Sequence, residues 1–240
     1  MAVFDTTQTL GGYVAFPVRY NCAPHDCTWA GGHLFGELAW STNGLNFSRV
    51  GDQPLFPNAG LPGATFPSLL SAGQIYPTSM LPNPSGDGSW LVYAAVASVQ
   101  HGHGVDQSGD GWNCTGCSAI STYKIEKDRF VGLAGPGHLR TVPLRLGAAR
   151  GVAINLAVGE GNGSAVHAQL SHPTTRLALP GFSFADSHPA HDTDDLAWKP
   201  QWVGSRTVDD VDAAVVVLEL RLTGASKVFS VRGGFEKVRP

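Results

Sequence analysis

The sequence has few charged residues and contains no long apolar run. Lys, Arg, Asp and Glu make up 15% of the 240 residues, and the formal net charge is -3. This balance provides no basic surface for nucleic acid or for an acidic membrane. No apolar run approaches the roughly 18 residues that cross a bilayer. We therefore predict neither a nucleic-acid partner nor a membrane partner.

A secretory leader is also missing from the start of the sequence. The first residues, MAVFDTTQTLGGYVAF, lack a basic segment followed by an apolar one. Three Asn-x-Ser/Thr sequons, which begin at Asn46, Asn113 and Asn162, point the other way, although such tripeptides also arise by chance. We expect either an intracellular protein or a piece of a longer one. The sequons weakly favour an extracellular or secretory location.

No segment has a clear helical periodicity. Gly (30) and Pro (16) are abundant, whereas Lys and Glu are scarce, and a long helix needs Ala, Leu, Glu and Lys at 3.6-residue spacing. Short apolar segments separated by Gly, Pro, Asn and Asp turns recur instead, for example QIYPTSMLP (residues 74–82) and WLVYAAVA (residues 90–97). This pattern predicts an all-β protein.

Two parts of the N-terminal half share one layout. Residues 12–50 and 90–133 each contain an apolar strand, a long Cys-containing loop, a second strand, a turn and a short aromatic strand. Tandem antiparallel units of roughly 40 to 50 residues are typical of propeller blades. We therefore predict an incomplete β-propeller of about two blades over residues 1–134, with both Cys-containing loops on one face.

The C-terminal part consists of evenly spaced strands of alternating apolarity. In VVVLELRL (residues 215–222), the apolar side chains at even-numbered positions are predicted to lie on one face, with Glu219 and Arg221 on the other. Such half-buried alternation suits an antiparallel β-sandwich. We predict this sandwich over residues 135–240, after a boundary near Gly135-Pro136-Gly137.

Several segments carry a family resemblance. YVAFPVRY, GELAWSTNGLNF, QIYPTSM and WLVYAAVASVQHGHG look like final propeller blades, and YKIEKDRFVGL, LRTVPLRLGAARGVAINLAV, VHAQL, LPGFSFADSHPAHDTDDLAW and VVVLELRLTGASKVFSVRG look like the sandwich that follows them. Together they resemble the C-terminal part of glycoside hydrolases of the five-bladed propeller clan (families 32, 43 and 68). The Gly-Phe-Ser-x-x-Asp element at residues 181–186 is the most specific part.

The resemblance implies a carbohydrate ligand, but it also implies that the catalytic acids are missing. In that clan the three acidic groups come from earlier blades, and this chain has only about two. Two blades leave open sheet edges, which attract pairing. We therefore expect a truncated product, a fragment, or a chain completed by a partner or by self-association. Hydrolysis of O-glycosyl bonds is expected only if the missing blades are supplied.

Candidate substrate-binding residues lie mainly in the loop SVQHGHGVDQSGDGWNCTGC (residues 98–117). The resemblance implies that its His-Gly element lies near the central cleft, and a Trp can stack on a sugar ring; a solvated loop with an anchoring Trp is the alternative. Glycoside hydrolysis needs two carboxyl groups about 5 to 10 Å apart, but Asp26, Asp106, Asp110 and Glu37 match no motif of the clan's acids, so no catalytic residue is predicted. We expect Glu37 to be an exposed strand residue, although it could face a cleft. The substrate-binding candidates are His101, His103, Asp106, Trp112 and Glu37.

Two groups of residues raise the question of a metal. The four cysteines, Cys22, Cys27, Cys114 and Cys117, suit two disulfides, which a secreted context favours; a four-thiolate zinc site and free thiols are the alternatives. DSHPAHDTDD (residues 186–195) resembles a calcium ligand set near Asp186 and Asp192. It does not fit an EF-hand loop, and we favour a structural turn in which Asp side chains accept backbone N–H groups. We predict no cofactor.

Three functions are consistent with these observations. The first is a glycoside-hydrolase-like protein that acts on or binds carbohydrate. The second is a non-catalytic carbohydrate-binding or structural β module, and the third is a zinc-stabilised interaction protein.

Overall fold

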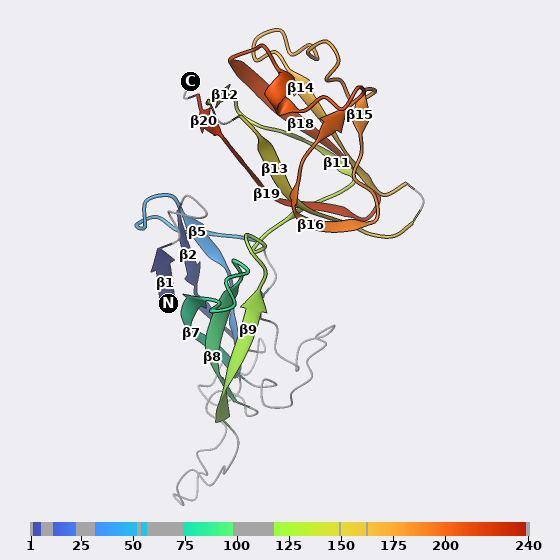
Figure 1. Ribbon diagram of the computed structural model, residues 1–240. Coiled ribbons are helices and arrows are strands. Elements are labelled where there is room, and N and C mark those ends of the chain that lie inside the picture. Colours follow the sequence, from blue (N-terminus) through green and yellow to red (C-terminus); the bar gives the residue numbers. More distant parts are fainter. Residues whose placement is uncertain are drawn as a thin grey trace, which may run out of the picture. The chain divides into compact units, whose positions relative to one another are not determined.

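The computed structural model describes residues 2–5, 12–22, 32–51, 54–56, 74–97, 118–148, 150–161 and 163–238. This part of the chain is all-β, as predicted, and its strands form mainly antiparallel sheets (Figure 1). The chain divides into two compact units, Met1–Lys127 and Asp128–Pro240. The division lies a few residues before the boundary that the sequence predicts.

Two sheets form the described part of the N-terminal unit. One has the order β1-β2-β5-β6, and the other has the order β3-β4-β7-β8-β9, in which β4 and β7 run parallel. The strands are β1 (Ala2–Asp5), β2 (Tyr13–Phe16), β3 (Val18–Cys22), β4 (Gly32–Gly36), β5 (Ala39–Ser41), β6 (Ser48–Arg49), β7 (Gln74–Pro82), β8 (Trp90–Ala97) and β9 (Ser118–Ile125). The bounds of β7 and β8 are those of the predicted strands.

Two apolar segments, residues 12–20 and 34–42, are each divided between the two sheets. Pro17 separates β2 from β3, because proline has no N–H to donate to a sheet. Opposite this break, Glu37 and Leu38 separate β4 from β5, and the Glu37 N–H donates to the Pro17 carbonyl at 2.8 Å. The two chain segments therefore pass together from one sheet to the other.

Aromatic contacts link the sheets of the N-terminal unit. The ring of Phe16 lies 5.4 Å from that of Phe4 and 5.6 Å from that of Phe56, which in turn lies 4.9 Å from Tyr123. Phe16 and Ile75 are fully buried. Edge and tilted ring pairs of this kind add to the stabilisation that burial provides.

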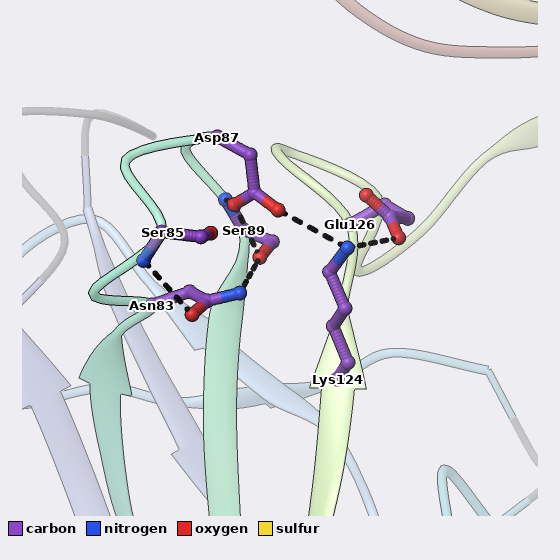
Figure 2. Close-up of polar contacts among 6 residues, drawn as sticks. All are labelled: Asn83, Ser85, Asp87, Ser89, Lys124 and Glu126. Carbon is purple, nitrogen blue, oxygen red and sulfur yellow. Dashed lines mark hydrogen bonds and ion pairs between the residues drawn. The ribbon is translucent and has the colours of Figure 1, made fainter.

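The turn between β7 and β8 is held by its own polar side chains (Figure 2). Asn83 Nδ2 donates to Ser89 Oγ at 2.9 Å, and Asp87 Oδ1 accepts from the Ser89 N–H at 2.8 Å. Lys124 on β9 lies 3.1 Å from Asp87 and 2.9 Å from Glu126. The hydrogen bonds from Ser89 hold the pKa of Asp87 well below its usual range, and the hydrogen bond to Glu126 raises that of Lys124.

The C-terminal unit contains two larger sheets and a two-stranded ribbon. One sheet has the order β10-β19-β13-β16; in the other, β18 pairs with β11 and β12 on one side and with β14 on the other, and β20 pairs with β12. The strands are β10 (Leu133–Ala134), β11 (Gly137–Arg140), β12 (Leu144–Leu146), β13 (Val152–Val158), β14 (Ala165–Ser171), β15 (Ser187–His188), β16 (Thr193–Trp198), β17 (Gln201–Trp202), β18 (Val215–Thr223), β19 (Ser226–Gly233) and β20 (Phe235–Lys237). A short 3-10 helix, η2 (Val208–Asp210), precedes β18.

The core of this unit is one apolar cluster with contributions from both larger sheets. Leu156 on β13, Leu170 on β14, and Leu218 and Leu220 on β18 are fully buried in it, as is Trp202. The predicted alternation of β18 is confirmed for its apolar face. On the opposite face Arg221 is exposed but Glu219 is buried, because Ser171 and His138 contact its carboxylate.

Candidate functional site

Most of the predicted binding residues lie outside the described part of the chain. These are His101, His103, Asp106 and Trp112, together with Cys27, Cys114 and Cys117; of Cys22 only the backbone, at the end of β3, is described. Their roles therefore stay predictions.

Glu37 is the one predicted substrate-binding residue that the structure describes. It is 2% exposed and lies between β4 and β5, so the expectation of an exposed strand residue was wrong. Its Oε1 atom lies 3.3 Å from Arg19 Nη1, and its Oε2 atom lies 2.8 Å from Arg49 Nε. Arg19 lies on β3 and Arg49 lies on β6, and these strands belong to different sheets. The two ion pairs of Glu37 therefore connect the sheets.

The acidic segment over residues 186–195 contains β15 and the first residues of β16, with non-strand residues before and between them. Asp186 Oδ2 accepts from the N–H of Ser183 at 3.2 Å and from its hydroxyl at 2.6 Å, and these bonds hold the pKa of Asp186 below its usual range. Asp195 Oδ1 accepts from the Ala197 N–H at 2.7 Å. The predicted role of aspartates as acceptors of backbone N–H groups is confirmed at these two positions.

Nothing in the described structure assembles this segment into a metal site. Asp192 is exposed and has a φ of 40°, and Asp194 pairs with Arg129, which lowers the pKa of Asp194. Across the described ranges, no group of three or more His, Cys, Asp or Glu side chains is placed to hold a metal ion. The prediction of no cofactor, with calcium near Asp186 and Asp192 as its alternative, stays a prediction.

A cavity of about 540 Å³ in the C-terminal unit is a candidate site that the sequence did not indicate. Its walls combine apolar side chains with three charged ones. The lining residues are Leu179, Pro180, Phe182, Arg206, Asp210, Val211, Asp212 and Ala213. Cavities of roughly 300–1,000 Å³ with apolar walls and a few polar groups are typical of small-ligand sites.

One wall of the cavity is a turn fixed on β14. The Leu179 N–H donates to the Leu170 carbonyl at 2.8 Å, and the Leu170 N–H donates to the Phe182 carbonyl at 3.0 Å. Gly181 has a φ of 80°, a conformation that glycine adopts without strain. The ring of Phe182 then packs at 5.2 Å, edge to face, on Trp202, so this apolar surface has a defined position.

A second part of the cavity lining consists of residues at the end of η2 and directly after it. The N–H of Thr207 donates to Asp210 Oδ2 at 2.8 Å, and Thr207 Oγ1 accepts from the Asp209 N–H at 3.3 Å, which forms a capping box. The Arg150 guanidinium donates to the carbonyl of Val211. The segment that leads to Asp212 is therefore held at both of its ends.

The charged groups of the cavity differ in how far they are engaged. Arg206 Nη1 donates to the Pro180 carbonyl at 3.4 Å, and its guanidinium lies 5.8 Å from the centre of the Phe182 ring. Asp210 uses one oxygen in the cap of η2. The Asp212 carboxylate makes no hydrogen bond or ion pair with any described residue and is exposed. Arg206 can donate to a ligand, and Asp212 can accept from one.

Only one lining residue belongs to a motif that the sequence analysis singles out. The Gly-Phe-Ser-x-x-Asp element contributes Phe182, whereas Arg206 and Asp212 follow it by twenty or more residues in polar segments without a motif. The fold alone brings them together.

Comparisons of the chain with protein-family models, with curated proteins and with solved structures found no match. In the described ranges, no helix has the length and apolarity needed to cross a membrane.

Proposed function

We propose that this chain is a non-catalytic carbohydrate-binding β protein that holds a sugar in the cavity of Phe182, Arg206 and Asp212. A sugar ring presents an apolar C–H surface and a rim of hydroxyls. The cavity offers the complement, with an apolar wall that includes Phe182 and a donor and an acceptor on charged side chains. The pairing of an apolar wall with the unengaged carboxylate of Asp212 is the observation that carries the proposal.

Binding without hydrolysis is the better interpretation of this cavity. A glycosidase needs two carboxyl groups, one as acid and one as base or nucleophile. Asp210 is engaged in the cap of η2, which leaves Asp212 as the available carboxyl group among the lining residues. In the other unit, Glu37 is likewise held by two arginines.

The fold assignment that accompanies this proposal has two parts. We interpret the two sheets of the N-terminal unit as a pair of propeller-type blades, although residues 12–50 contribute strands to both sheets and do not form one blade as the sequence predicts. The shared aromatic contacts of Phe16 and Phe56 support this interpretation. We interpret the two larger sheets of the C-terminal unit as a β-sandwich, which the single apolar cluster between their strands supports.

Calorimetric titration of the full chain with oligosaccharides from β-fructan, arabinan and xylan tests the proposal. Asp212→Asn removes the charge without disturbing a contact, and we expect at least tenfold weaker binding, because a hydrogen bond to a charged group contributes about 1.5–3 kcal/mol. Asp209→Asn, on η2 but outside the cavity lining, is the matched control and should bind normally. Failure of all these sugars to bind, or equal affinity for Asp212→Asn and the unaltered chain, would reject the site.

A further inference from the structure

The outer face of the sheet formed by β11, β18 and β14 carries two arginines, Arg140 and Arg221, and two histidines, His138 and His167. On β18, Arg221 is the Cα partner of His138 on β11 and of His167 on β14. On the next row of the same face, Arg140 is the partner of Glu219. Arg140 and Arg221 are therefore diagonal neighbours on one face, a relation in which residues lie about 7–8 Å apart, within reach of long side chains.

The carboxylate on this face, that of Glu219, contacts a serine and a histidine and forms no ion pair with either arginine. Glu219 Oε1 accepts from the Ser171 hydroxyl at 2.5 Å, and Oε2 lies 3.0 Å from His138 Nε2. Gln169 Nε2 donates to the same hydroxyl at 3.1 Å. Glu219 forms no ion pair with Arg140, although the two residues are register partners.

The hydrogen-bond donors of both arginines are available to another molecule. Arg140 and Arg221 are exposed, and neither makes a hydrogen bond or ion pair with a described residue. The guanidinium of Arg221 lies 4.3 Å from the centre of the Phe184 ring. Phe184 itself is fixed, because its N–H donates to Gln169 Oε1 at 3.2 Å. Stacking of this kind orients the planar fork before any ligand arrives.

The histidines do not supply a compensating negative charge. His138 is half exposed and contacts both Glu219 and the edge of Phe184, at 5.7 Å between ring centres. His167 Nδ1 is buried without a hydrogen-bond partner in the described structure.

We propose that Arg140 and Arg221 form an oxyanion site, separate from the cavity, that binds the carboxylate or sulfate group of an acidic saccharide. Guanidinium groups match such anions with paired N–H donors. Only the saccharide part of this proposal rests on the proposed function; the oxyanion site rests on the charges of this face.

Titration of the full chain with trigalacturonate, with a sulfated trisaccharide and with the uncharged galactose trisaccharide tests the site. We expect both anionic sugars to bind at least tenfold more tightly than the neutral one, and the tighter of the two identifies the group that the site prefers. Arg140→Gln and Arg221→Gln should each weaken this binding at least tenfold. Arg221→Lys should weaken it severalfold, because the charge remains but the fork is lost.

Arg145→Gln is the matched control. Arg145 is an exposed arginine on the same face, and its register partner on β20 is Glu236. We expect less than a twofold effect on binding. An equal loss in all three glutamine variants, or no preference for the anionic sugars, would overturn the proposal.

Inorganic sulfate separates this site from the proposed function. Sulfate should shift the side-chain NMR signals of Arg140 and Arg221 but not that of Arg145, and this result does not depend on whether the cavity binds sugar. Conversely, if Asp212→Asn abolishes binding of neutral sugars while sulfate leaves Arg140 and Arg221 unchanged, the cavity stands and the oxyanion site is rejected.

Discussion

Replacing Glu37 with glutamine should destabilise the N-terminal unit, because the buried carboxylate connects its two sheets. The change keeps the shape of the side chain but removes the charge that Arg19 and Arg49 face at 3.3 and 2.8 Å. Breaking a fully buried ion pair costs about 3–5 kcal/mol. Here the arginine side chains are 44% and 54% exposed, so water compensates part of the loss. We expect a decrease of about 2 kcal/mol in the free energy of opening, near the low end for a hydrogen bond to a charged group.

Hydrogen exchange followed by mass spectrometry measures this loss within one unit of the full chain, where a single unfolding transition cannot be assumed. A loss of about 2 kcal/mol should accelerate exchange of the protected β2 to β5 amides roughly thirtyfold. Glu126→Gln is the control, because Glu126 lies in an ion pair between half-exposed side chains and should change exchange by less than about twofold. Exchange in Glu37→Gln as slow as in that control would refute the structural role of Glu37.

Three further predictions concern the C-terminal unit. Trp202→Phe should lower the free energy of unfolding in urea by about 1–3 kcal/mol, because it removes the hydrogen bond from Nε1 to the buried Ala168 carbonyl at 3.0 Å; an unchanged midpoint would contradict this. Burial, together with Arg221 and His191, lowers the pKa of His167. The unfolded chain therefore binds its proton more readily, stability should fall as the pH drops below about 6.5, and His167→Gln should flatten that slope in urea titrations; a slope that His167→Gln leaves intact would contradict the assignment. Gly181→Ala should weaken sugar binding in calorimetry, because Gly181 has a φ of 80° and a Cβ would collide with the Arg206 guanidinium; normal affinity would show that Arg206 is not needed there.

The sequence predicts the strands better than their division into sheets. β7 and β8 match their predicted bounds, because Gly, Pro and polar residues delimit each apolar run. The breaks at Pro17 and Glu37 were not anticipated, since an apolar run has the same pattern whether it stays in one sheet or passes into a second. The sequence predicts an exposed Glu37, because no local pattern shows that two arginines on other strands will pair with its carboxylate.

The candidate sites depend even more on contacts between distant residues. The Gly-Phe-Ser-x-x-Asp element was singled out in the sequence, and it places Phe182 in the cavity and Phe184 on the opposite face of the turn, against Arg221. Arg206 is placed at the cavity by its backbone hydrogen bonds with Trp202, and Asp212 follows the capped helix η2. Arg140 and Arg221 become diagonal neighbours only because β11 pairs with β18 in this register. A local sequence pattern does not show which distant residues the fold will bring together.

A crystal structure of the full chain with a bound oligosaccharide would show directly whether the cavity of Phe182, Arg206 and Asp212 holds a sugar. We expect a sugar ring whose C–H surface lies on Leu179 and Pro180, the accessible apolar lining beside the buried Phe182, with hydroxyls that accept from Arg206 and donate to Asp212. A sugar bound elsewhere, with this cavity empty, would show that the cavity is not the binding site.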